Sequence, residues 1–198
     1  HKTRNKMKHN LLIDHLNKYG KISEDEEKSI RKYFIQLETE KKQILIKEHS
    51  PCNKLFFVNS GFIRAYYTND KGNEITRMFA WEGRFLTNIA SFGNFAENTE
   101  IIETVKTAEI LQINREDFVS LISSSSNLKS IYTDILEECN AFHIKRFEYL
   151  NTYDLNKKIS YLKKDFPNLI SELNDSLLSS FLGISRVHFA NNKHLLYK

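Results

Sequence analysis

The sequence predicts an α+β protein with an N-terminal β domain, a long helix and a C-terminal group of short helices. Between residues 35 and 113, short segments rich in β-branched and aromatic residues alternate with turn sequences, a pattern typical of antiparallel strands. Residues 127–151 contain neither glycine nor proline, which favours one uninterrupted helix. After residue 152 the apolar residues recur at helical spacing in shorter runs.

A first helix is expected over about residues 24–35. Ser23 and Glu26 have the spacing of a capping box, in which each side chain accepts a hydrogen bond from a main-chain amide of the first turn. Ile30 and Phe34 then lie one turn apart and supply an apolar face.

The β domain is expected over residues 35–113, with turn chemistry at residues 59–61, 69–73 and 82–83. Many short strands at this spacing favour a sandwich, a barrel or a jelly roll. The expected strands lie at residues 44–46, 55–58, 62–67, 75–79, 101–105 and 110–113.

The β domain is expected to lead through a short helix into the long one. Asn114, with Glu116 and Asp117 behind it, is typical of a helix N-cap and predicts a helix through Ile122. The long helix carries apolar residues at alternating four- and three-residue spacing, interrupted at Arg146. Such a stripe has to be buried, either against the chain's own β domain or against a second copy of the chain. The seam residues are Leu128, Tyr132, Ile135, Cys139, Phe142 and Tyr149.

Two helices are expected on either side of Gly183, which supplies the left-handed residue of a tight turn. Asn174 is placed to cap the first helix, and Ser185 to cap the second, which is expected to run to about Leu195. Ile184 fills the angle between them. The inward side chains of the first helix are Leu178, Phe181 and Leu182. This is the layout of a helix-turn-helix, whose second helix enters the major groove of DNA.

With these elements in order, the chain resembles the Crp/Fnr family over nearly its whole length. The segment Asn59-Ser60-Gly61-Phe62-Ile63-Arg64 is similar to the family's v-x-x-G-x-v-r strand, and Leu182-Gly183-Ile184-Ser185 to its helix-turn-helix. The resemblance implies a double-stranded β-helix (a jelly roll or cupin-like β-roll) as a sensor domain over residues 1–122. It also implies a dimerisation helix over residues 123–151 and a DNA-binding domain over residues 152–198.

The resemblance further implies a homodimeric transcription regulator that binds a palindromic operator in double-stranded DNA and contacts RNA polymerase. The residues expected to contact DNA are Ser185, Arg186, Val187, His188, Asn191 and Lys193. The chain departs from the family at Val187, where a glutamate is common, and at Asn191, where an arginine is common. Asn192 also replaces an apolar residue that is usually packed inside. An altered operator and a degenerate helix-turn-helix that no longer binds DNA both stay open.

Relatives that bind a cyclic nucleotide hold it with a Gly-Glu pair and an Arg-Ser/Thr pair. These pairs align with Thr87-Asn88 and Asn98-Thr99, so neither the glutamate nor the arginine is present. A phosphate desolvated without its arginine loses roughly several kcal/mol. We therefore expect neither cAMP nor cGMP to bind, and no cofactor. The residues expected to line a remaining effector pocket are Arg84, Phe85, Thr87, Asn88, Asn98 and Thr99, with Arg84 the nearest substitute cation.

Composition excludes several classes of function. The two cysteines cannot supply the four thiolates of an iron–sulfur cluster or a Cys-only zinc site. His49 is the only histidine between residues 35 and 113, so the clustered ligands of a metal-dependent cupin enzyme are missing. Gly-rich phosphate loops and nucleophile motifs are missing too. We expect no metal site and no enzyme.

Charge and hydropathy bear on the partners. The last 48 residues hold six Lys and one Arg against three Asp and one Glu, a local excess of +3 that suits an anionic partner. No apolar run approaches the roughly 18–20 residues that span a bilayer, and no signal-peptide stretch follows the basic start. We expect a cytoplasmic protein without a membrane partner. The alternative function is a dimeric β-roll sensor or protein-interaction protein whose degenerate helix-turn-helix does not bind DNA.

Overall fold

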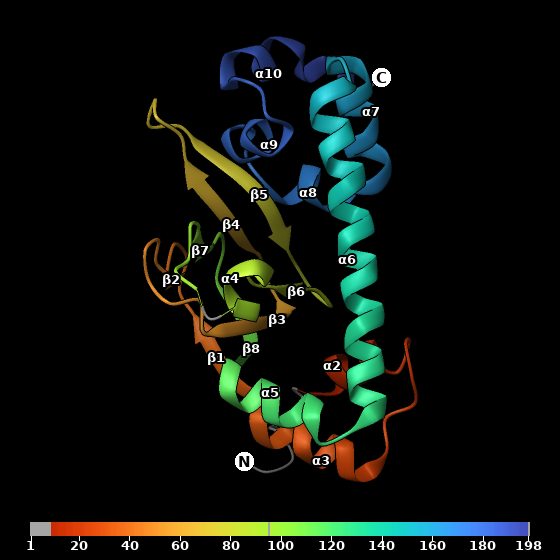
Figure 1. The fold of residues 1–198 in the computed structure, drawn as a ribbon. Helices are drawn as coiled ribbons and strands as arrows, with labels where there is room; N and C mark the ends of the chain where they lie inside the picture. The colour runs from red at the N-terminus through yellow and green to blue at the C-terminus, as the bar shows by residue number, and fades with distance from the viewer. Residues whose placement is uncertain (1–8, 95, 198) are drawn as a thin grey trace. The chain divides into compact units, whose positions relative to one another are not determined.

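The structure, a computed structural model, describes residues 9–94 and 96–197 (Figure 1). The chain divides into two compact units. Unit 1 comprises residues 1–67 and 78–137, and unit 2 comprises residues 68–77 and 138–198. The long helix is thus shared between the units, and a β-hairpin tip belongs to unit 2. From the sequence, domain boundaries were expected at residues 122 and 151, with each domain formed by one continuous stretch of chain. These boundaries stay a prediction.

Unit 1 is built on two four-stranded sheets with the orders β1-β8-β3-β6 and β2-β7-β4-β5. The strands of the first sheet are Ile35–Thr39 (β1), Lys54–Ser60 (β3), Phe85–Leu86 (β6) and Ala108–Asn114 (β8). Those of the second are Ile44–Ile46 (β2), Ile63–Thr68 (β4), Glu74–Ala80 (β5) and Ile101–Thr104 (β7). The six expected strands are all present, in an antiparallel β-roll. β1 and β6 were not expected, because β6 has two residues and β1 carries little apolar signal.

Both sheets contribute side chains to one buried core. Its strand residues include Phe56, Val58, Ile63, Ala65, Ile102 and Ile110. Burying a large apolar side chain contributes about 1.5–3 kcal/mol, so this core stabilises the roll. The other face of β3 is covered as well, since the ring of Phe57 lies 5.6 Å from that of His15 in Asn10–Leu16 (α2).

Helices close one end of unit 1 (Figure 1). They are Glu24–Tyr33 (α3), Arg115–Ser123 (α5) and the beginning of Ser126–Thr152 (α6), while Ile89–Asn94 (α4) lies beside the sheets. The predicted capping box of α3 is confirmed, with Ser23 Oγ accepting from the Glu26 amide. Glu26 also accepts hydrogen bonds from Ser125 and Asn127, which tie α3 to the start of α6. Asn114 occupies the N-cap position of α5, but its side chain makes no capping hydrogen bond.

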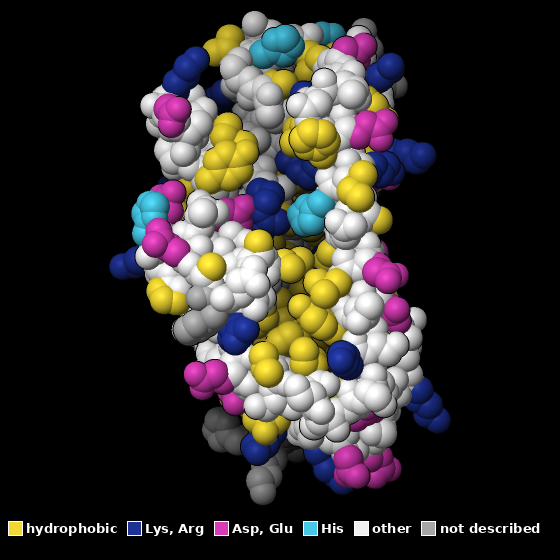
Figure 2. Space-filling view, in the orientation of Figure 1, with side chains coloured by type: hydrophobic (Ala, Val, Ile, Leu, Met, Phe, Trp, Pro, Cys, Tyr) yellow, Lys and Arg dark blue, Asp and Glu magenta, His cyan; other side chains and the backbone are white. Residues whose placement is uncertain are grey.

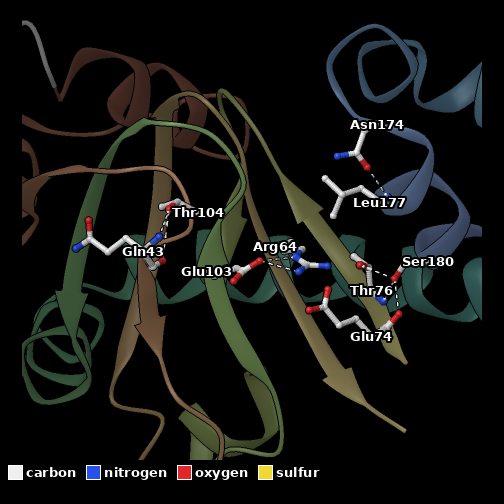
Figure 3. Close-up of polar contacts among 9 residues, drawn as sticks. All are labelled: Gln43, Arg64, Glu74, Thr76, Glu103, Thr104, Asn174, Leu177 and Ser180. Atoms are coloured by element: carbon white, nitrogen blue, oxygen red, sulfur yellow. Dashed lines mark hydrogen bonds and ion pairs between the residues drawn. The ribbon is translucent and has the colours of Figure 1, made fainter. Parts of the chain in front are cut away.

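The β3–β4 turn explains why the Gly-x-x-Arg spacing of the strand motif is needed. Gly61 has φ +85°, and a Cβ added to it would collide with the main-chain oxygen of Thr107. Three residues later, Nε and Nη2 of the buried Arg64 donate to Glu103 Oε1 on β7 at 2.8 and 2.6 Å (Figure 3). The Arg64 guanidinium also stacks 3.9 Å from the ring centre of Tyr66. The motif therefore fixes a tight turn and an ion pair across two strands.

Unit 2 combines the β4–β5 hairpin tip, residues 68–77, with the C-terminal half of α6 and the remaining helices. These helices are Leu155–Asp165 (α7), Pro167–Glu172 (α8), Asp175–Leu182 (α9), Arg186–Asn192 (α10) and the 3-10 helix Lys193–Tyr197 (η1). Aromatic rings fill the core of this unit. Consecutive ring centres of Tyr149, Tyr161, Phe166 and Phe181 lie 4.3, 5.4 and 5.4 Å apart.

The surface, the helices and the titratable side chains can each be compared with what a protein partner, a membrane or a metal ion would require. Figure 2 shows hydrophobic side chains gathered beside the N-terminal half of α6, over unit 1. Of the helices that the structure describes, none is long and apolar enough to cross a membrane. Cys52 and Cys139 form no disulfide with each other. Across residues 9–94 and 96–197, no group of three or more His, Cys, Asp or Glu side chains is placed to hold a metal ion.

We predict that Gly61→Ala destabilises unit 1 more than Gly83→Ala does. Both glycines have positive φ, so each alanine loses about 1–2 kcal/mol of backbone free energy. Only at position 61 would the new methyl group meet a neighbour, since nothing lies within 4 Å at Gly83. The collision should add about 1–3 kcal/mol. Urea unfolding followed by circular dichroism measures the difference, and equal losses for the two variants would contradict the role of the Thr107 oxygen.

Candidate functional site

The pair of helices α9 and α10 forms as the local sequence predicts. Asn174 Oδ1 accepts a hydrogen bond from the Leu177 amide at 3.0 Å and caps α9 (Figure 3). Gly183 ends that helix with φ +65°, the left-handed conformation that glycine adopts without strain. Ser185 Oγ accepts from the His188 amide at 3.1 Å and caps α10. The turn from α9 into α10 is therefore specified by residues 174–185 themselves.

One face of this helix pair is buried and another is open. The expected inward residues of α9, namely Leu178, Phe181 and Leu182, are each at most 2% exposed. From α10, Phe189 is fully buried. Ser185, Arg186, His188 and Asn191 are exposed, and Val187 is 70% exposed. Five of the six predicted DNA-contacting residues thus lie together on the open side of α10.

Lys193, the sixth predicted DNA contact, is placed differently. Its Nζ lies 2.7 Å from Asp175 Oδ1 in the first turn of α9. This hydrogen bond raises the pKa of Lys193. Asn192 is also engaged, because its Nδ2 donates to the main-chain oxygen of His188 at 2.9 Å. The polar residue at this usually apolar position therefore has a local hydrogen-bond partner.

Two cations hold the C-terminal end of α9. The guanidinium of Arg146, from α6, donates through Nη2 to the Phe181 carbonyl at 2.7 Å and stacks 3.8 Å from the centre of the Phe181 ring. Lys158 Nζ, from α7, donates to the Leu182 carbonyl at 3.4 Å. Because the last carbonyls of a helix lack intrahelical donors and carry partial negative charge, these contacts stabilise the end of α9 just before its turn.

The burial of these groups perturbs their protonation. Burial, and then the charge of Arg146, lower the pKa of Lys158. Burial raises the pKa of Tyr149 well above its usual range, and its hydroxyl donates to the Lys158 carbonyl at 3.1 Å. The tyrosine is thus a neutral structural donor. No chemistry at the exposed face of α10 depends on these shifts.

The hairpin tip is tied to the same helix by Ser180. Its hydroxyl lies 2.9 Å from Thr76 Oγ1, accepts from the Thr76 amide at 2.8 Å and donates to the Glu74 carbonyl at 2.7 Å (Figure 3). Arg146 strengthens this attachment, because its Nη2 and Nε also donate to the carbonyls of Thr76 and Arg77 at 3.1 and 2.9 Å. One arginine therefore joins α6, α9 and the hairpin tip.

Sequence reasoning missed both of these residues. Ser180 was treated only as part of α9, and Arg146 only as the interruption of an apolar stripe. That interruption was the available signal, because a charged residue at an otherwise inward position needs buried acceptors. Its partners lie as far as 70 residues away, so the sequence alone could not name them.

A second candidate site lies in the β-roll, at the positions that align with a nucleotide-binding segment. Thr87 Oγ1 donates to the Lys54 carbonyl at 2.8 Å and lies 3.4 Å from Cys52 Sγ. Asn88 Nδ2 donates to Asn98 Oδ1 at 3.1 Å. The fully buried Asn98 donates in turn to the carbonyls of Lys47 and Glu100. The structure therefore brings Thr87, Asn88 and Asn98 together as a cluster of neutral groups.

The other predicted pocket residues are Arg84, Phe85 and Thr99. The contacts described for Arg84 and Phe85 are with residues outside this cluster. The guanidinium of Arg84 stacks 4.8 Å from the centre of the Trp81 ring. The ring of Phe85 lies 4.9 Å from that of Phe57 and 5.5 Å from that of His15. Thr99 is exposed. The guanidinium of Arg84 therefore stacks on Trp81, whereas Thr87, Asn88 and Asn98 form their own group of contacts.

His49 adjoins this cluster in an unusual conformation. It has φ +61°, its amide donates to the Asn98 carbonyl at 2.8 Å, and its Nδ1 lies 2.5 Å from Glu97 Oε1. The hydrogen bond with Glu97 raises the pKa of His49. These contacts fasten the segment around Asn98 to the loop after β2.

The predicted seam residues of α6 divide into two groups. Leu128 and Tyr149 are 5% and 1% exposed within their own chain. Tyr132 packs on Phe118 at 5.0 Å, and Phe142 on Phe166 at 5.9 Å, measured between ring centres. Ile135 and Cys139 are half-buried. Leu128 and Tyr132 therefore pack within unit 1, in line with the alternative of burial against the chain's own β domain. Phe142 and Tyr149 pack on the helices of unit 2, a cover that neither sequence alternative named.

Two apolar residues of α6 that sequence analysis did not single out are open to solvent. Ile144 is 62% exposed and Phe147 is 72% exposed. They lie three residues apart on one helix face. Their side chains fell outside the four- and three-residue spacing that we followed from Leu128, which is why the pattern did not include them.

Comparison with known proteins supports the fold. Residues 36–125 match the family model described as Cyclic nucleotide-binding domain. The regulator CLP of Xanthomonas campestris, described as c-di-GMP responsive, is 15% identical with a TM-score of 0.69, over 88% of this chain and 92% of its own. A crp/fnr-family regulator from Eubacterium rectale is 17% identical with a TM-score of 0.68, over 86% and 81%. FixK2 of Bradyrhizobium japonicum is 11% identical with a TM-score of 0.69, over 83% and 84%.

The fold is thus that of a cyclic nucleotide-binding domain followed by helices. Over 83–88% of its length the chain has the fold of these three regulators, so the resemblance inferred from the sequence is confirmed at the level of the fold. At these identities the structural likeness establishes the fold alone. No curated protein sequence matches the chain significantly.

We predict that Arg146→Met destabilises unit 2. The Thr76, Arg77 and Phe181 carbonyls would lose their donor, and each buried unsatisfied acceptor costs about 1–3 kcal/mol. Hydrogen exchange of the α9 amides should become faster by at least about tenfold, which corresponds to 1.4 kcal/mol. Lys164→Met, a change of the same kind at an exposed position of α7, should leave the exchange unchanged. Unaltered α9 exchange in Arg146→Met would contradict the assigned role.

Proposed function

We propose that the chain is a homodimeric, DNA-binding transcription regulator of the Crp/Fnr type that acts in the cytoplasm. In this proposal α9 and α10 are a helix-turn-helix, and the β-roll of unit 1 is a sensor domain of double-stranded β-helix type. A palindromic operator and a contact with RNA polymerase belong to the proposal because the family implies them.

The observation that carries the proposal is the open face of α10. Phe189 secures the helix from inside, while Arg186, Val187, His188 and Asn191 stand free of the protein core. Arginine and asparagine are the side chains that pair in bidentate fashion with guanine and adenine. The excess of +3 over the last 48 residues supports a polyanionic partner.

We also propose that neither cAMP nor cGMP is the effector. A cyclic phosphate requires a buried cation, and the aligned positions carry the neutral Thr87, Asn88 and Asn98. The side-chain amide of Asn98 already donates to two main-chain carbonyls. A phosphate would have to break these bonds and then lie desolvated beside neutral groups, which disfavours binding.

The proposed homodimer uses α6. Tyr132, Phe142 and Tyr149 have ring contacts within the chain, so we propose that the outward residues Ile144 and Phe147 take part in the seam. The predicted seam residue Ile135 lies about 180° around the helix axis from Ile144 and therefore does not share this face. Two large apolar side chains exposed one turn apart favour burial against a second copy.

The alternative function, a dimeric sensor or protein-interaction protein that does not bind DNA, draws on Val187, Asn191 and Asn192, the departures from the family. The retained turn, its two caps and the exposed Arg186 favour DNA binding over that alternative. Both functions would use the same dimer, so a DNA-binding experiment separates them.

We predict that selection of random duplexes on the purified chain, at near-physiological salt, enriches a palindrome with half-sites about one helical turn apart. Adding cAMP or cGMP should change neither the selected sequence nor the affinity.

Arg186→Ala should lower affinity for that operator by about 1–3 kcal/mol and leave the fold intact. Lys164→Met serves as the matched loss of one charge outside α10. No enriched duplex, with or without cell extract, would refute the proposed function.

We predict that Phe147→Glu and Ile144→Glu give folded monomers with weakened operator binding. A glutamate on this face would have to be buried against a second copy without a partner, which is strongly unfavourable. Analytical ultracentrifugation measures the association state. The control is Val119→Glu, at an apolar residue of α5 that is 41% exposed, which should stay dimeric. A dimer that persists in the Phe147 variant would remove these residues from the seam.

A further inference from the structure

We propose that Val187 and Asn191 form the centre of the DNA-contacting face and recognise A·T base pairs, Val187 through the thymine methyl group and Asn191 through adenine. The inference rests on the proposed function and specifies its target. Arg186 and His188 then flank a neutral centre.

The position of the buried residue on α10 places these two side chains. Each helical residue advances about 100° around the axis, so Val187 and Asn191 both lie about 160° from Phe189. Phe189 is fully buried and Val187 is 70% exposed, which agrees with this geometry. The stripe directly opposite the protein core therefore consists of an isopropyl group and a carboxamide.

The neighbouring polar residues do not displace this pair from the centre. Lys193 is held by Asp175 at 2.7 Å, and Asn192 donates to the His188 carbonyl at 2.9 Å. Both lie on the side of α10 nearer to Phe189. Arg186 lies about 100° from Val187, so its guanidinium serves a base at the edge of the contacted step.

The chemistry of the two central side chains selects the base. An exposed valine has no polar group to offer, and in the major groove the apolar feature is the C5-methyl group of thymine. An asparagine carboxamide donates to N7 and accepts from N6 of adenine in a bidentate pair. Both features belong to the A·T pair, and neither occurs on G·C.

The spacing of Val187 and Asn191 along the helix lets them reach neighbouring bases of one half-site. Four residues of α-helix rise about 6 Å, and successive bases on a strand lie about 3.4 Å apart. Val187 and Asn191 therefore address bases that lie no more than about two steps apart. The half-site should contain A·T pairs at its centre and a guanine for Arg186 at the flank.

The experiment uses the full chain and the operator obtained by selection. Replacing each central thymine by deoxyuridine removes only the methyl group and should weaken wild-type binding about fourfold per half-site, as expected for one buried methyl group. Val187→Ala should bind the thymine operator about as weakly and be insensitive to the replacement. Replacing the central adenine by 7-deazaadenine should weaken the wild type but not Asn191→Ala.

A control variant outside α10 tests whether the loss of sensitivity to deoxyuridine is specific to Val187. Val119→Ala, which shortens an exposed apolar side chain outside α10, should keep full sensitivity to deoxyuridine. An enriched operator with central G·C pairs, or one whose binding by the wild type is unaffected by deoxyuridine, would overturn the inference while leaving the proposed function intact. If no operator is enriched at all, the proposed function and this inference fall together.

Discussion

The rest of unit 2 depends on how the carbonyls at the end of α9 are satisfied. A helix that stops at a left-handed glycine leaves its last carbonyls without intrahelical donors, and here that end lies beside the buried ring of Phe181. Arg146 and Lys158 donate to the carbonyls of Phe181 and Leu182. With these bonds the Gly183 turn has one orientation, and that orientation decides which side of α10 is exposed.

The same arginine explains why ten residues of a β-hairpin belong to unit 2. Arg146 binds the carbonyls of Thr76 and Arg77, and Ser180 binds Glu74 and Thr76. The hairpin tip is thereby part of the framework that supports α9. β4 and β5 continue from this tip into the sheet of unit 1, so two strands and one helix run through both units.

Sequence reasoning succeeded where the determining residues lie within a few positions of each other. The caps at Ser23, Asn174 and Ser185, the turn at Gly183 and the six principal strands all depend on local chemistry. The short helix α4 and the two-residue strand β6 carry too few residues for such a signal.

The surroundings of the predicted seam and pocket residues were harder to predict, because their packing partners are distant in sequence. Phe142 is covered by Phe166, 24 residues later, and Tyr149 by Tyr161. A heptad pattern records that a residue needs burial, but the packing partner decides whether the cover is the same chain or another one. The resemblance to the family pointed to Thr87, Asn88 and Asn98 but could not reveal that Asn88 donates to Asn98 or that Thr87 donates to the Lys54 carbonyl.

Two polar sites in the β-roll differ in a way that bears on which ligands the proposed sensor domain could bind. Arg64 and Glu103 keep a buried ion pair on neighbouring strands, so this roll does accommodate a buried guanidinium where a carboxylate accompanies it. Around Asn98, which aligns with the nucleotide-binding pairs of relatives, the polar groups are neutral and bind one another or main-chain groups. Asn98 binds Asn88 and two carbonyls, while its own amide donates to the Ser50 carbonyl and its carbonyl accepts from the His49 amide.

These five hydrogen bonds satisfy the polar groups of the buried Asn98 within the protein. Each bond contributes only about 1 kcal/mol net, but a buried group left unpaired costs about 1–3 kcal/mol. An effector that entered here would have to replace the bonds of Asn98 one for one. A neutral ligand with both donors and acceptors can do so, whereas a phosphate, which offers acceptors and a charge, leaves the Lys47 and Glu100 carbonyls facing it. Those carbonyls would repel an anion, so an effector of the proposed sensor domain that bound at these positions would have to be uncharged.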